Sequence, residues 1–361
     1  MANLDKLTGR SRLKILVTGD RGYIGTVMVP YLLQRGHEVV GLDAEYYSNG
    51  SLFAPPEGYI HNLKDVRDVQ MDELVGFEAI VHLAALSNDP LGDLNPELTY
   101  DINYRATIRL AQLAREAGVP RFLYASSCSL YGAAGDNLLD ESAPMRPLTC
   151  YAESKVRSED ALSKLADRDF APVYLRNATA YGASPRLRLD IVLNNLMGWA
   201  VTTGRVRITS DGTPWRPMAH VEDIAQAFAC VLQAPLDVIS NQAFNVGTNN
   251  QNYQVRELAS FVQETVGHCN IEYANQTGPD PRNYRVDFSK LARMLPTFSP
   301  VWSARTGARE LFDAYRTAGM TTEDFHGRRF TRLKQLRFLL EDRQVDGTLR
   351  WVGQPRLPIT A

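Results

Sequence analysis

Three side chains in the middle of the chain have the types and spacing needed for proton transfer. Tyr151 and Lys155 are four residues apart in a stretch with a helical pattern, so the phenol and the ammonium group project from one face. Ser127 ends an apolar, strand-like run earlier in the chain. A tyrosine and a lysine at this spacing are often only a surface pair. A serine at a strand end, where ligands bind in doubly wound sheets, favours a catalytic centre instead.

A glycine-rich loop near the N-terminus has the pattern of a turn that binds phosphate. Gly19, Gly22 and Gly25 follow the apolar run Lys14–Thr18 and precede a helical stretch over 24–35. The first glycine would allow a tight turn, the second a close approach of a pyrophosphate, and the third close packing of helix on sheet. Phosphates would then meet N–H groups at the helix N-terminus. This context predicts a dinucleotide site rather than a purely structural turn.

The residue after the next apolar run bears on the choice of cofactor. Asp43 follows 37–42 and is placed to accept hydrogen bonds from the hydroxyls of an adenosine ribose. A carboxylate there would repel a 2′-phosphate, which favours NAD over NADP. Arg21 argues the other way, because a loop arginine can pair with that phosphate, although it can equally be an exposed loop side chain. We expect NAD.

Apolar runs alternate with helical patterns through the first half of the chain. This alternation predicts an α/β fold with a doubly wound parallel sheet, covered by helices on both faces. We expect residues 1–180 to form the cofactor-binding domain, with a segment near 215–250 returning to it through a strand at Ala243–Val246. Residues 181–361 should form mainly a smaller substrate-binding lobe and a C-terminal tail. The strands and helices expected in the first half are Lys14–Thr18, 24–35, 37–42, 79–83, 95–117, 122–126, 151–166 and 173–176.

Bulk composition excludes several classes of protein. The 361 residues exceed what one small core needs, and 39 basic against 41 acidic residues give no electrostatic case for nucleic acid or membrane as partner. No apolar run has the length of a signal peptide or a spanning helix. Four cysteines without metal-like spacing predict no metal site and a reduced, cytoplasmic protein. The basic residues within 326–350 are best interpreted as the solvated face of a terminal helix.

Together the motifs resemble the extended short-chain dehydrogenase/reductase superfamily, in its branch of sugar-nucleotide epimerases, dehydratases and reductases. They run in family order over roughly residues 13–290 and are highly specific for the superfamily, but much less so for the reaction. The resemblance implies a Rossmann-like fold, NAD as cofactor and a nucleotide-diphosphate sugar as substrate. The matching segments are TGDRGYIG at 18–25, Asp43, KDVRD at 64–68, VHLAA at 81–85, Asn103, SSCSLYG at 126–132, YAESK at 151–155, HVEDIAQAF at 220–228 and FNVG at 244–247.

The resemblance also implies a role for each catalytic residue. Tyr151 would be the general acid and base, with Lys155 and the nicotinamide charge lowering the pKa of its phenol and Lys155 also holding the nicotinamide ribose. Ser127 would hydrogen-bond the reacting hydroxyl. Asn103 would order the active-site helix or a water, or merely stabilise a kink. The expected cofactor-binding residues are Gly19, Arg21, Gly22, Tyr23, Ile24, Gly25, Asp43, Asp65, Val66, Leu83, Ala84, Ala85, Asn103, Ser126, Tyr151 and Lys155.

The two residues after Ser127 narrow the reaction. Family dehydratases carry an Asp-Glu pair there and family decarboxylases a glutamate at the position of Ser129, so Cys128 and Ser129 disfavour both reactions. Galactose-type 4-epimerases carry a small hydroxyl residue at that position. A fucose-type epimerase-reductase would need its cysteine there, and Cys128 is one residue too early, which favours a core role.

We therefore expect 4-epimerisation through a transient 4-keto sugar. An NAD(P)H-dependent 4-keto-sugar reductase would use the same residues and remains the main alternative. A regulatory protein that binds NAD(P) without catalysis is a minor one, because such proteins typically lose the tyrosine or the lysine.

On the substrate side, the family pattern has an arginine four residues before a His-Val pair, and Arg216 fits it, so the resemblance implies that Arg216 binds the nucleotide diphosphate. Thr179 stands where many relatives carry asparagine, and its shorter side chain disfavours an ordinary UDP-glucose or UDP-galactose substrate. We expect His220 to be structural.

Relatives dimerise through the helices that correspond to 95–117 and 151–166, so we expect a homodimer, although the apolar face of 106–114 suits an intrachain core equally well. The expected substrate-binding residues are Ser127, Ser129, Thr179, Asn195, Arg216 and Arg282.

Overall fold

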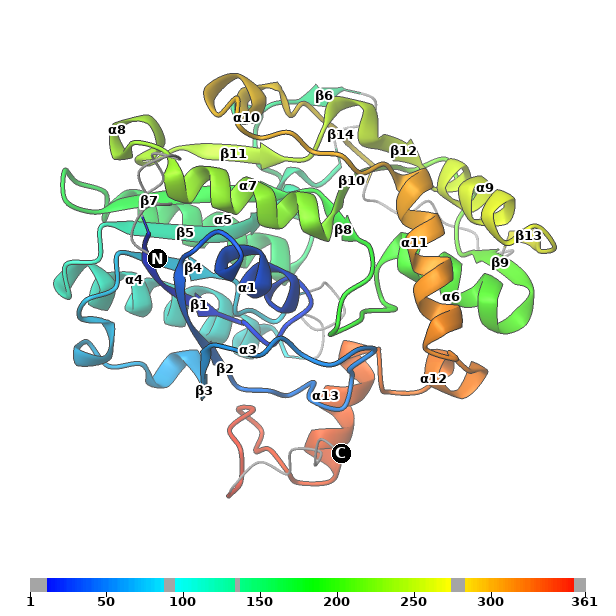
Figure 1. The fold of residues 1–361 in the computed structure, drawn as a ribbon, viewed down its shortest axis with the longest axis horizontal. Helices are drawn as coiled ribbons and strands as arrows, with labels where there is room; N and C mark the ends of the chain where they lie inside the picture. The colour runs from blue at the N-terminus through cyan, green and yellow to red at the C-terminus, as the bar shows by residue number, and fades with distance from the viewer. Residues whose placement is uncertain (1–11, 88–94, 134–136, 274–282, 354–361) are drawn as a thin grey trace.

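The computed structural model describes residues 12–87, 95–133, 137–273 and 283–353, and a parallel sheet of seven strands forms its centre (Figure 1). The strand order is β11-β7-β5-β4-β1-β2-β3. The path through the sheet starts at the inner strand β1, moves outward through β2 to β3, and then crosses to β4 on the other side of β1. Ligands bind where the direction of winding reverses in such sheets, beyond the carboxyl ends of β1 and β4. The strands are β1 (Lys14–Thr18), β2 (Glu38–Asp43), β3 (Ile60–Leu63), β4 (Ala79–His82), β5 (Arg121–Ser127), β7 (Ala171–Asn177) and β11 (Ala243–Val246).

Helices cover both faces of this sheet, as the alternation of apolar runs predicted. Successive residues of a strand point to opposite faces. In β1, Ile15 and Val17 enter the hydrophobic core that contains residues of α1 (Gly25–Leu33) and α7 (Val221–Gln233). Leu16 enters the core on the other face, with residues of α4 (Ala106–Glu116) and α5 (Cys150–Ser163). The doubly wound α/β prediction is therefore confirmed.

The helix predicted over 95–117 is not a regular α-helix. It consists of α3 (Pro96–Tyr100), a π-helical turn η3 (Asp101–Arg105) and α4. Such π-turns concentrate at functional sites because they redirect a side chain within a helix. The apolar residues of α4, including Leu110 and Ala114, are buried in the chain's own core. The structure therefore supports the interpretation of this apolar face as part of the chain's own core. The homodimer stays a prediction.

The strand β3 was missed because it lacks the apolar run that marks a buried parallel strand. It lies at the edge of the sheet, and Ile60 and Leu63 are exposed. The expected strand at Ala243–Val246 is β11, which pairs with β7 at the opposite edge. Around the sheet lie α8 (Leu236–Ile239), α10 (Ser289–Met294), the pair β6 (Leu138–Leu139) and β14 (Arg285–Val286), and the short helices η1 (Val66–Asp68), η2 (Asp72–Leu74), η4 (Cys128–Tyr131) and η5 (Asn249–Gln251).

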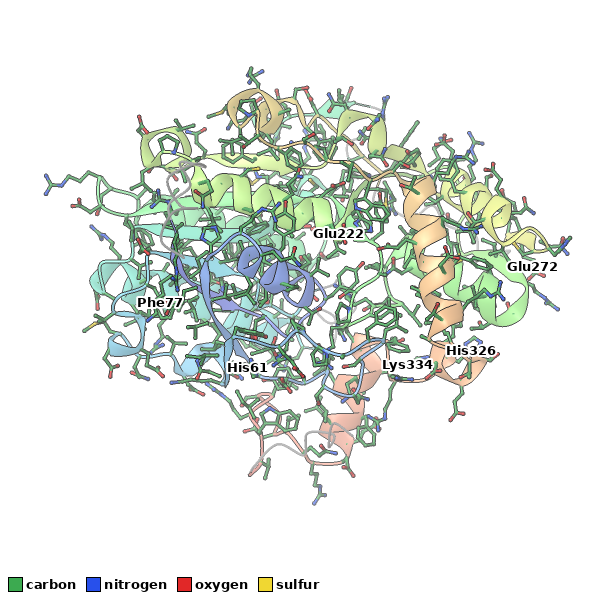
Figure 2. The ribbon with its side chains drawn as sticks, in the orientation of Figure 1. His61, Phe77, Glu222, Glu272, His326 and Lys334 are labelled. Carbon is green, nitrogen blue, oxygen red and sulfur yellow. The ribbon has the colours of Figure 1, made fainter. Side chains whose placement is uncertain are left out.

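A second group of elements lies beyond the carboxyl ends of the strands and has its own hydrophobic core (Figure 1). Charged side chains such as Glu272 lie at its periphery (Figure 2). No helix among the described residues combines the length and the apolar character needed to cross a membrane. The elements of this lobe are β8 (Thr179–Tyr181), α6 (Val192–Thr203), β9 (Arg205–Ile208), β10 (Trp215–His220), β12 (Asn252–Gln254), α9 (Val255–Val266), β13 (Asn270–Tyr273), α11 (Ala304–Thr317) and α12 (Thr322–His326).

The last helix, α13 (Arg332–Glu341), packs beside the loop that follows β2 (Figure 1). The prediction of a solvated basic face holds for Lys334 and Arg337, which are exposed. It is wrong for Arg332, which is only 2% exposed. Helical periodicity places Arg332 beside Leu336 on the buried face, and a count of charges cannot show that.

Candidate active site

A cavity of about 520 Å³ lies between the carboxyl ends of the strands and the second lobe. Most of the residues predicted to bind cofactor or substrate line it. Arg21 and Asn103 do not, and Arg282 lies outside the described residues. The predicted residues that line the cavity are Gly19, Gly22, Tyr23, Ile24, Gly25, Asp43, Asp65, Val66, Leu83, Ala84, Ala85, Ser126, Ser127, Ser129, Tyr151, Lys155, Thr179, Asn195 and Arg216.

The glycine loop owes its shape to two close backbone contacts. Gly19 has a φ of +77°, and a Cβ there would lie 2.8 Å from the backbone nitrogen of Ala84. A Cβ on Gly25 would lie 2.1 Å from the carbonyl oxygen of Gly19. Only glycine fits either position, and α1 can therefore begin directly against β1. The N-terminus of α1 faces the cavity, and the positive end of the helix dipole there favours a phosphate.

At the end of β2, the carboxyl of Asp43 lies in the cavity wall. Burial raises its pKa to about 6, and repulsion from Asp20 adds to the shift. Arg21, predicted to contact the cofactor, is turned away: its guanidinium donates to the carbonyl of Pro56 (3.2 Å) and lies 3.6 Å from a carboxylate oxygen of Glu45. The prediction for this side chain is corrected, because the nearby carboxylate attracts it.

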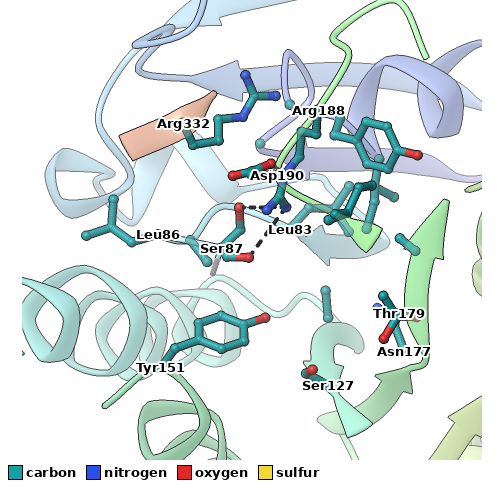
Figure 3. Close-up of a pocket in the computed structure, with 18 of the residues that line it drawn as sticks. Leu83, Leu86, Ser87, Ser127, Tyr151, Asn177, Thr179, Arg188, Asp190 and Arg332 are labelled. Atoms are coloured by element: carbon teal, nitrogen blue, oxygen red, sulfur yellow. Dashed lines mark hydrogen bonds and ion pairs between the residues drawn. The ribbon is translucent and has the colours of Figure 1, made fainter. Parts of the chain in front are cut away.

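The residues predicted to transfer protons lie on one side of the cavity. Figure 3 shows Tyr151 with its hydroxyl directed into the cavity, on the same side as Ser127. The ammonium of Lys155 donates to the carbonyl of Ala125 (2.7 Å) and lies 5.6 Å from the Tyr151 ring centroid. Burial lowers the pKa of Lys155 to about 7. Since the Ser127 hydroxyl already accepts from the backbone N–H of Ser129 (3.1 Å), its proton remains available for a ligand.

Helix α5 is held to the sheet by a buried ion pair one turn beyond Lys155. Glu159 and Arg176 lie 2.7 Å apart and are each at most 5% exposed. The hydroxyl of Ser126 also donates to Glu159 (2.5 Å). Ser126 lines the cavity, but its hydroxyl is already bound to Glu159, so it helps to position the helix that carries Tyr151.

Asn103 lies in the π-turn, behind the cavity. Its amide oxygen accepts from the backbone N–H of Leu86 (2.8 Å), and its nitrogen donates to the Leu86 carbonyl (3.0 Å) and to the hydroxyl of Ser154 in α5 (3.3 Å). These contacts link the segment after β4 to α5, which agrees with a role for Asn103 in ordering the active-site helix. Both this role and the predicted cofactor contact stay predictions.

Two further expectations concern residues with no direct catalytic role. Cys128 is fully buried, its thiol donates to the Arg176 carbonyl (3.1 Å), and burial raises its pKa. His220 is fully buried, bonds Glu310 (2.8 Å) and stacks on Trp302. Both residues are structural, as predicted.

The structure adds a residue that the sequence reasoning missed beside Ser127. Asn177 ends β7 and is directly paired with Ser127 in the sheet register, so the two side chains share a face. The amide nitrogen donates to the Ser126 carbonyl (3.3 Å). Among the described residues, its amide oxygen and the hydroxyl of Ser129 are buried without a hydrogen-bond partner, and both residues line the cavity. Unpartnered polar atoms of this kind are expected where a polar ligand binds.

The far end of the cavity belongs to the second lobe and is basic. Arg216 in β10 lines it and is 7% exposed. Arg207 in β9, which sequence reasoning missed, lines the same end. Thr179 and Asn195 lie between this end and Tyr151, and the Asn195 amide also donates to the Leu189 carbonyl (2.8 Å). Two arginines at one end can bind a diphosphate.

Two more cationic residues that the sequence reasoning missed lie near the glycine loop. Arg188 donates to Asp190 (2.9 Å) and to the hydroxyl of Ser87 (3.1 Å), the contact drawn in Figure 3. Arg332 of α13 lines the same part of the cavity. The sequence beyond residue 180 does not predict that Arg188 and Arg332 lie together, because their proximity depends on how distant segments pack.

Comparison with known proteins places the chain among enzymes of nucleotide sugars. The sequence model of the NAD dependent epimerase/dehydratase family matches residues 15–247. UDP-glucose 4-epimerase of Bacillus subtilis is 28% identical over 328 residues, which cover 83% of this chain and 94% of that protein. UDP-glucuronic acid decarboxylase 1 of Arabidopsis thaliana is 27% identical over 334 residues, covering 88% and 73%. The solved structure of MoeE5 in complex with UDP-glucuronic acid and NAD has a TM-score of 0.74 at 28% identity, covering 84% of this chain and 99% of that chain.

Proposed function

Because the chain belongs to the NAD-dependent epimerase/dehydratase family, we propose that it is a sugar-nucleotide 4-epimerase that works through a transient 4-keto sugar. The proposal rests on one observation: the glycine loop, the Tyr151–Ser127 pair and the two arginines of the second lobe line the same cavity. The cofactor and a nucleotide-diphosphate sugar can therefore lie end to end, with the sugar at the residues that transfer protons.

The reaction begins with removal of a proton from the sugar 4-hydroxyl. Tyr151 takes this proton as a phenolate, while Ser127 donates a hydrogen bond to the same oxygen. The glycine loop and Asp43 would hold NAD, which would supply a reversible acceptor for the C4 hydrogen as hydride. Lys155 stabilises the phenolate while it is cationic, and the bound nicotinamide charge acts in the same direction. Arg207 and Arg216 bind the diphosphate, so the reacting end can move while the nucleotide end stays in place.

Inversion requires the ketone to present its other face before the hydrogen returns to C4. The unpartnered atoms of Ser129 and Asn177 lie beside the reacting position and can accept or donate hydrogen bonds in either orientation of the sugar. Once the hydrogen has returned to the opposite face of C4, Tyr151 gives its proton back to the C4 oxygen.

Position 129 argues against the other reactions of the relatives. Removal of water or carbon dioxide from a 4-keto sugar needs a side chain that exchanges protons with carbon or with the leaving group. Cys128 is buried with a raised pKa, and Ser129 has a weakly acidic hydroxyl. Neither side chain is suited to this proton exchange, whereas epimerisation needs only Tyr151 as acid and base.

The direct test replaces Tyr151 by phenylalanine. We expect Tyr151→Phe to lower kcat by at least about 10²–10⁴-fold, the usual contribution of a general acid and base. NAD should remain bound, because the change removes one oxygen. The matched control is Tyr273→Phe, at a tyrosine that is 51% exposed and outside the cavity lining. Turnover of sugar nucleotides followed by proton NMR is the measurement, and undiminished turnover of Tyr151→Phe would overturn the assignment.

A further inference from the structure

The C-terminal segment, residues 328–351, packs on the loop that follows β2. Gln335 makes two hydrogen bonds with this loop: its amide nitrogen donates to the Tyr46 carbonyl (3.1 Å), and its amide oxygen accepts from the Asn49 amide (3.0 Å). Figure 1 shows α13 beside this loop, far from the glycine loop in sequence but close to the end of β2. The segment thus supports the wall of the cavity next to Asp43.

The same segment reaches the neighbouring part of the wall. The indole N–H of Trp351 donates to the Ala44 carbonyl (2.7 Å), and the guanidinium of Arg350 lies 3.4 Å from Asp65. Leu336 and Leu339 share a hydrophobic cluster with Leu86 and Ile102. Six wall residues that line the cavity therefore contact the C-terminal segment directly or share its hydrophobic cluster: Ala44, Tyr46, Tyr47, Asp65, Leu86 and Ile102.

One residue of the segment enters the cavity itself. The guanidinium of Arg332 is buried, donates to the Arg186 carbonyl (3.2 Å) and lies 4.1 Å from the centroid of the Tyr47 ring. Burial lowers its pKa to about 10, with repulsion from Arg188 in the same direction, so it is still a cation at neutral pH. Among the described residues, no carboxylate pairs with it. A buried cation with five donors and so few acceptors requires an anion.

The surroundings of Arg332 identify which anion suits it. Arg186 connects it to the glycine loop, since the Arg186 guanidinium donates to the backbone carbonyls of Arg21 (3.0 Å) and Tyr47 (2.6 Å). Figure 3 shows Arg332 beside Arg188 and Asp190, on the side of the cavity opposite Ser127. The diphosphate of a sugar nucleotide would lie at the far end, with the arginines of the second lobe. The anion nearest the glycine loop is the pyrophosphate of the dinucleotide.

We propose that Arg332 is a cofactor-binding residue that contacts the pyrophosphate of NAD, and that the C-terminal segment closes the adenosine end of the cavity around it. The segment lies outside the part matched by the family model, residues 15–247. Its contacts retard release of the cofactor, as an enzyme that recycles its NAD within each turnover requires.

The test compares Arg332→Gln with Arg337→Gln, a matched change at an exposed arginine of the same helix. Affinities for NAD, ADP and adenosine are measured by calorimetry on cofactor-free protein. We expect Arg332→Gln to weaken the binding of NAD and of ADP about 10- to 100-fold, the usual range for a hydrogen bond to a charged group. The affinity for adenosine should be unchanged. Arg337→Gln should resemble the unmodified protein. Equal NAD affinity in the two variants would overturn the proposal, as would an equally large loss of affinity for adenosine, which has no phosphate.

A second measurement needs no variant, in case Arg332→Gln does not fold. Hydrogen exchange of the unmodified protein is followed with and without NAD. We expect NAD to slow exchange in residues 328–351 as well as in the glycine loop, because both would lose their local opening motions. Slowing confined to the glycine loop would contradict closure by the C-terminal segment. Both tests read cofactor binding alone, so their outcome is independent of whether the sugar reaction is epimerisation.

Discussion

At the scale of single residues, Asp43 at the end of β2 has a carboxyl group whose pKa is raised toward neutral pH. The pKa of Asp43 is raised to about 6 by burial, so its carboxylate is lost as the pH falls through 6. A ribose diol donates hydrogen bonds to the charged form more strongly than to the neutral acid. Cofactor affinity should therefore depend on pH where an ordinary aspartate would not.

This dependence is measurable by calorimetric titration of NAD between pH 5 and 8. Below about pH 6 the affinity should fall by up to about tenfold per pH unit, because binding selects the carboxylate. Asp43→Asn should bind NAD more weakly at pH 7.5 and should lose the slope. If Asp43→Asn showed the same dependence of NAD affinity on pH, the titrating group would be another residue.

Asn177 offers a second test at this scale. Its amide oxygen has no partner among the described residues and lies beside Ser127. We expect Asn177→Ala to lower kcat/KM about 10- to 100-fold by removing a hydrogen bond to the substrate, while NAD affinity is unchanged. Asn241→Ala, outside the cavity lining, is the control for loss of an asparagine. An equal effect of the two variants would mean that Asn177 has no role in substrate binding.

The residues to which we assign proton transfer could be proposed from the sequence, whereas Asn177 and Arg332 could not. The spacing of Tyr151 and Lys155 is fixed by one helical turn, and Ser127 by the end of a strand. Asn177 matters only because the register pairs it with Ser127. Arg332 faces the cavity only because α13 packs on the loop after β2. Local periodicity carries no information about either contact.

At the scale of elements, the placement of the catalytic helix depends on one buried ion pair. Glu159 of α5 bonds both Arg176 of β7 and Ser126 of β5. We expect Glu159→Gln to lower the free energy of unfolding by about 3–5 kcal/mol, because the buried guanidinium would lose its counter-charge. Urea denaturation measures the change.

The control for this prediction removes both charges. The double variant Glu159→Gln with Arg176→Met should recover much of the lost stability, because no buried charge is then left unpaired. If Glu159→Gln alone were as stable as the unmodified protein, the ion pair would not hold α5 to the sheet.

The elements of the first half were predictable because buried parallel strands are continuous apolar runs between glycine-marked helix ends. The exceptions have physical causes. The edge strand β3 is exposed and so lacks an apolar run, and the π-turn at Asp101–Arg105 preserves helical composition while changing the hydrogen bonding. The short strands of the second lobe depend on long-range pairing, such as that of β9 with β13.

At the scale of the whole molecule, the sheet and the second lobe form one cavity with two basic regions. Arg188 and Arg332 lie near the glycine loop, and Arg207 and Arg216 at the far end. This separation fits two diphosphates, one from the cofactor and one from the sugar nucleotide, with the proton-transfer residues between them. The expected homodimer is not needed for this arrangement, because a single chain supplies every residue named.

The central claim is that the protein inverts a sugar carbon without net consumption of cofactor. The most direct measurement incubates the NAD-loaded protein with a panel of nucleotide-linked sugars in deuterated water and follows each by proton NMR, with no cofactor added. We predict a 4-epimer that keeps its original hydrogen at C4, because hydride passes to the cofactor and back without contact with solvent. Consumption of a 4-keto sugar only when NADH or NADPH is supplied, or release of water or carbon dioxide, would contradict the account.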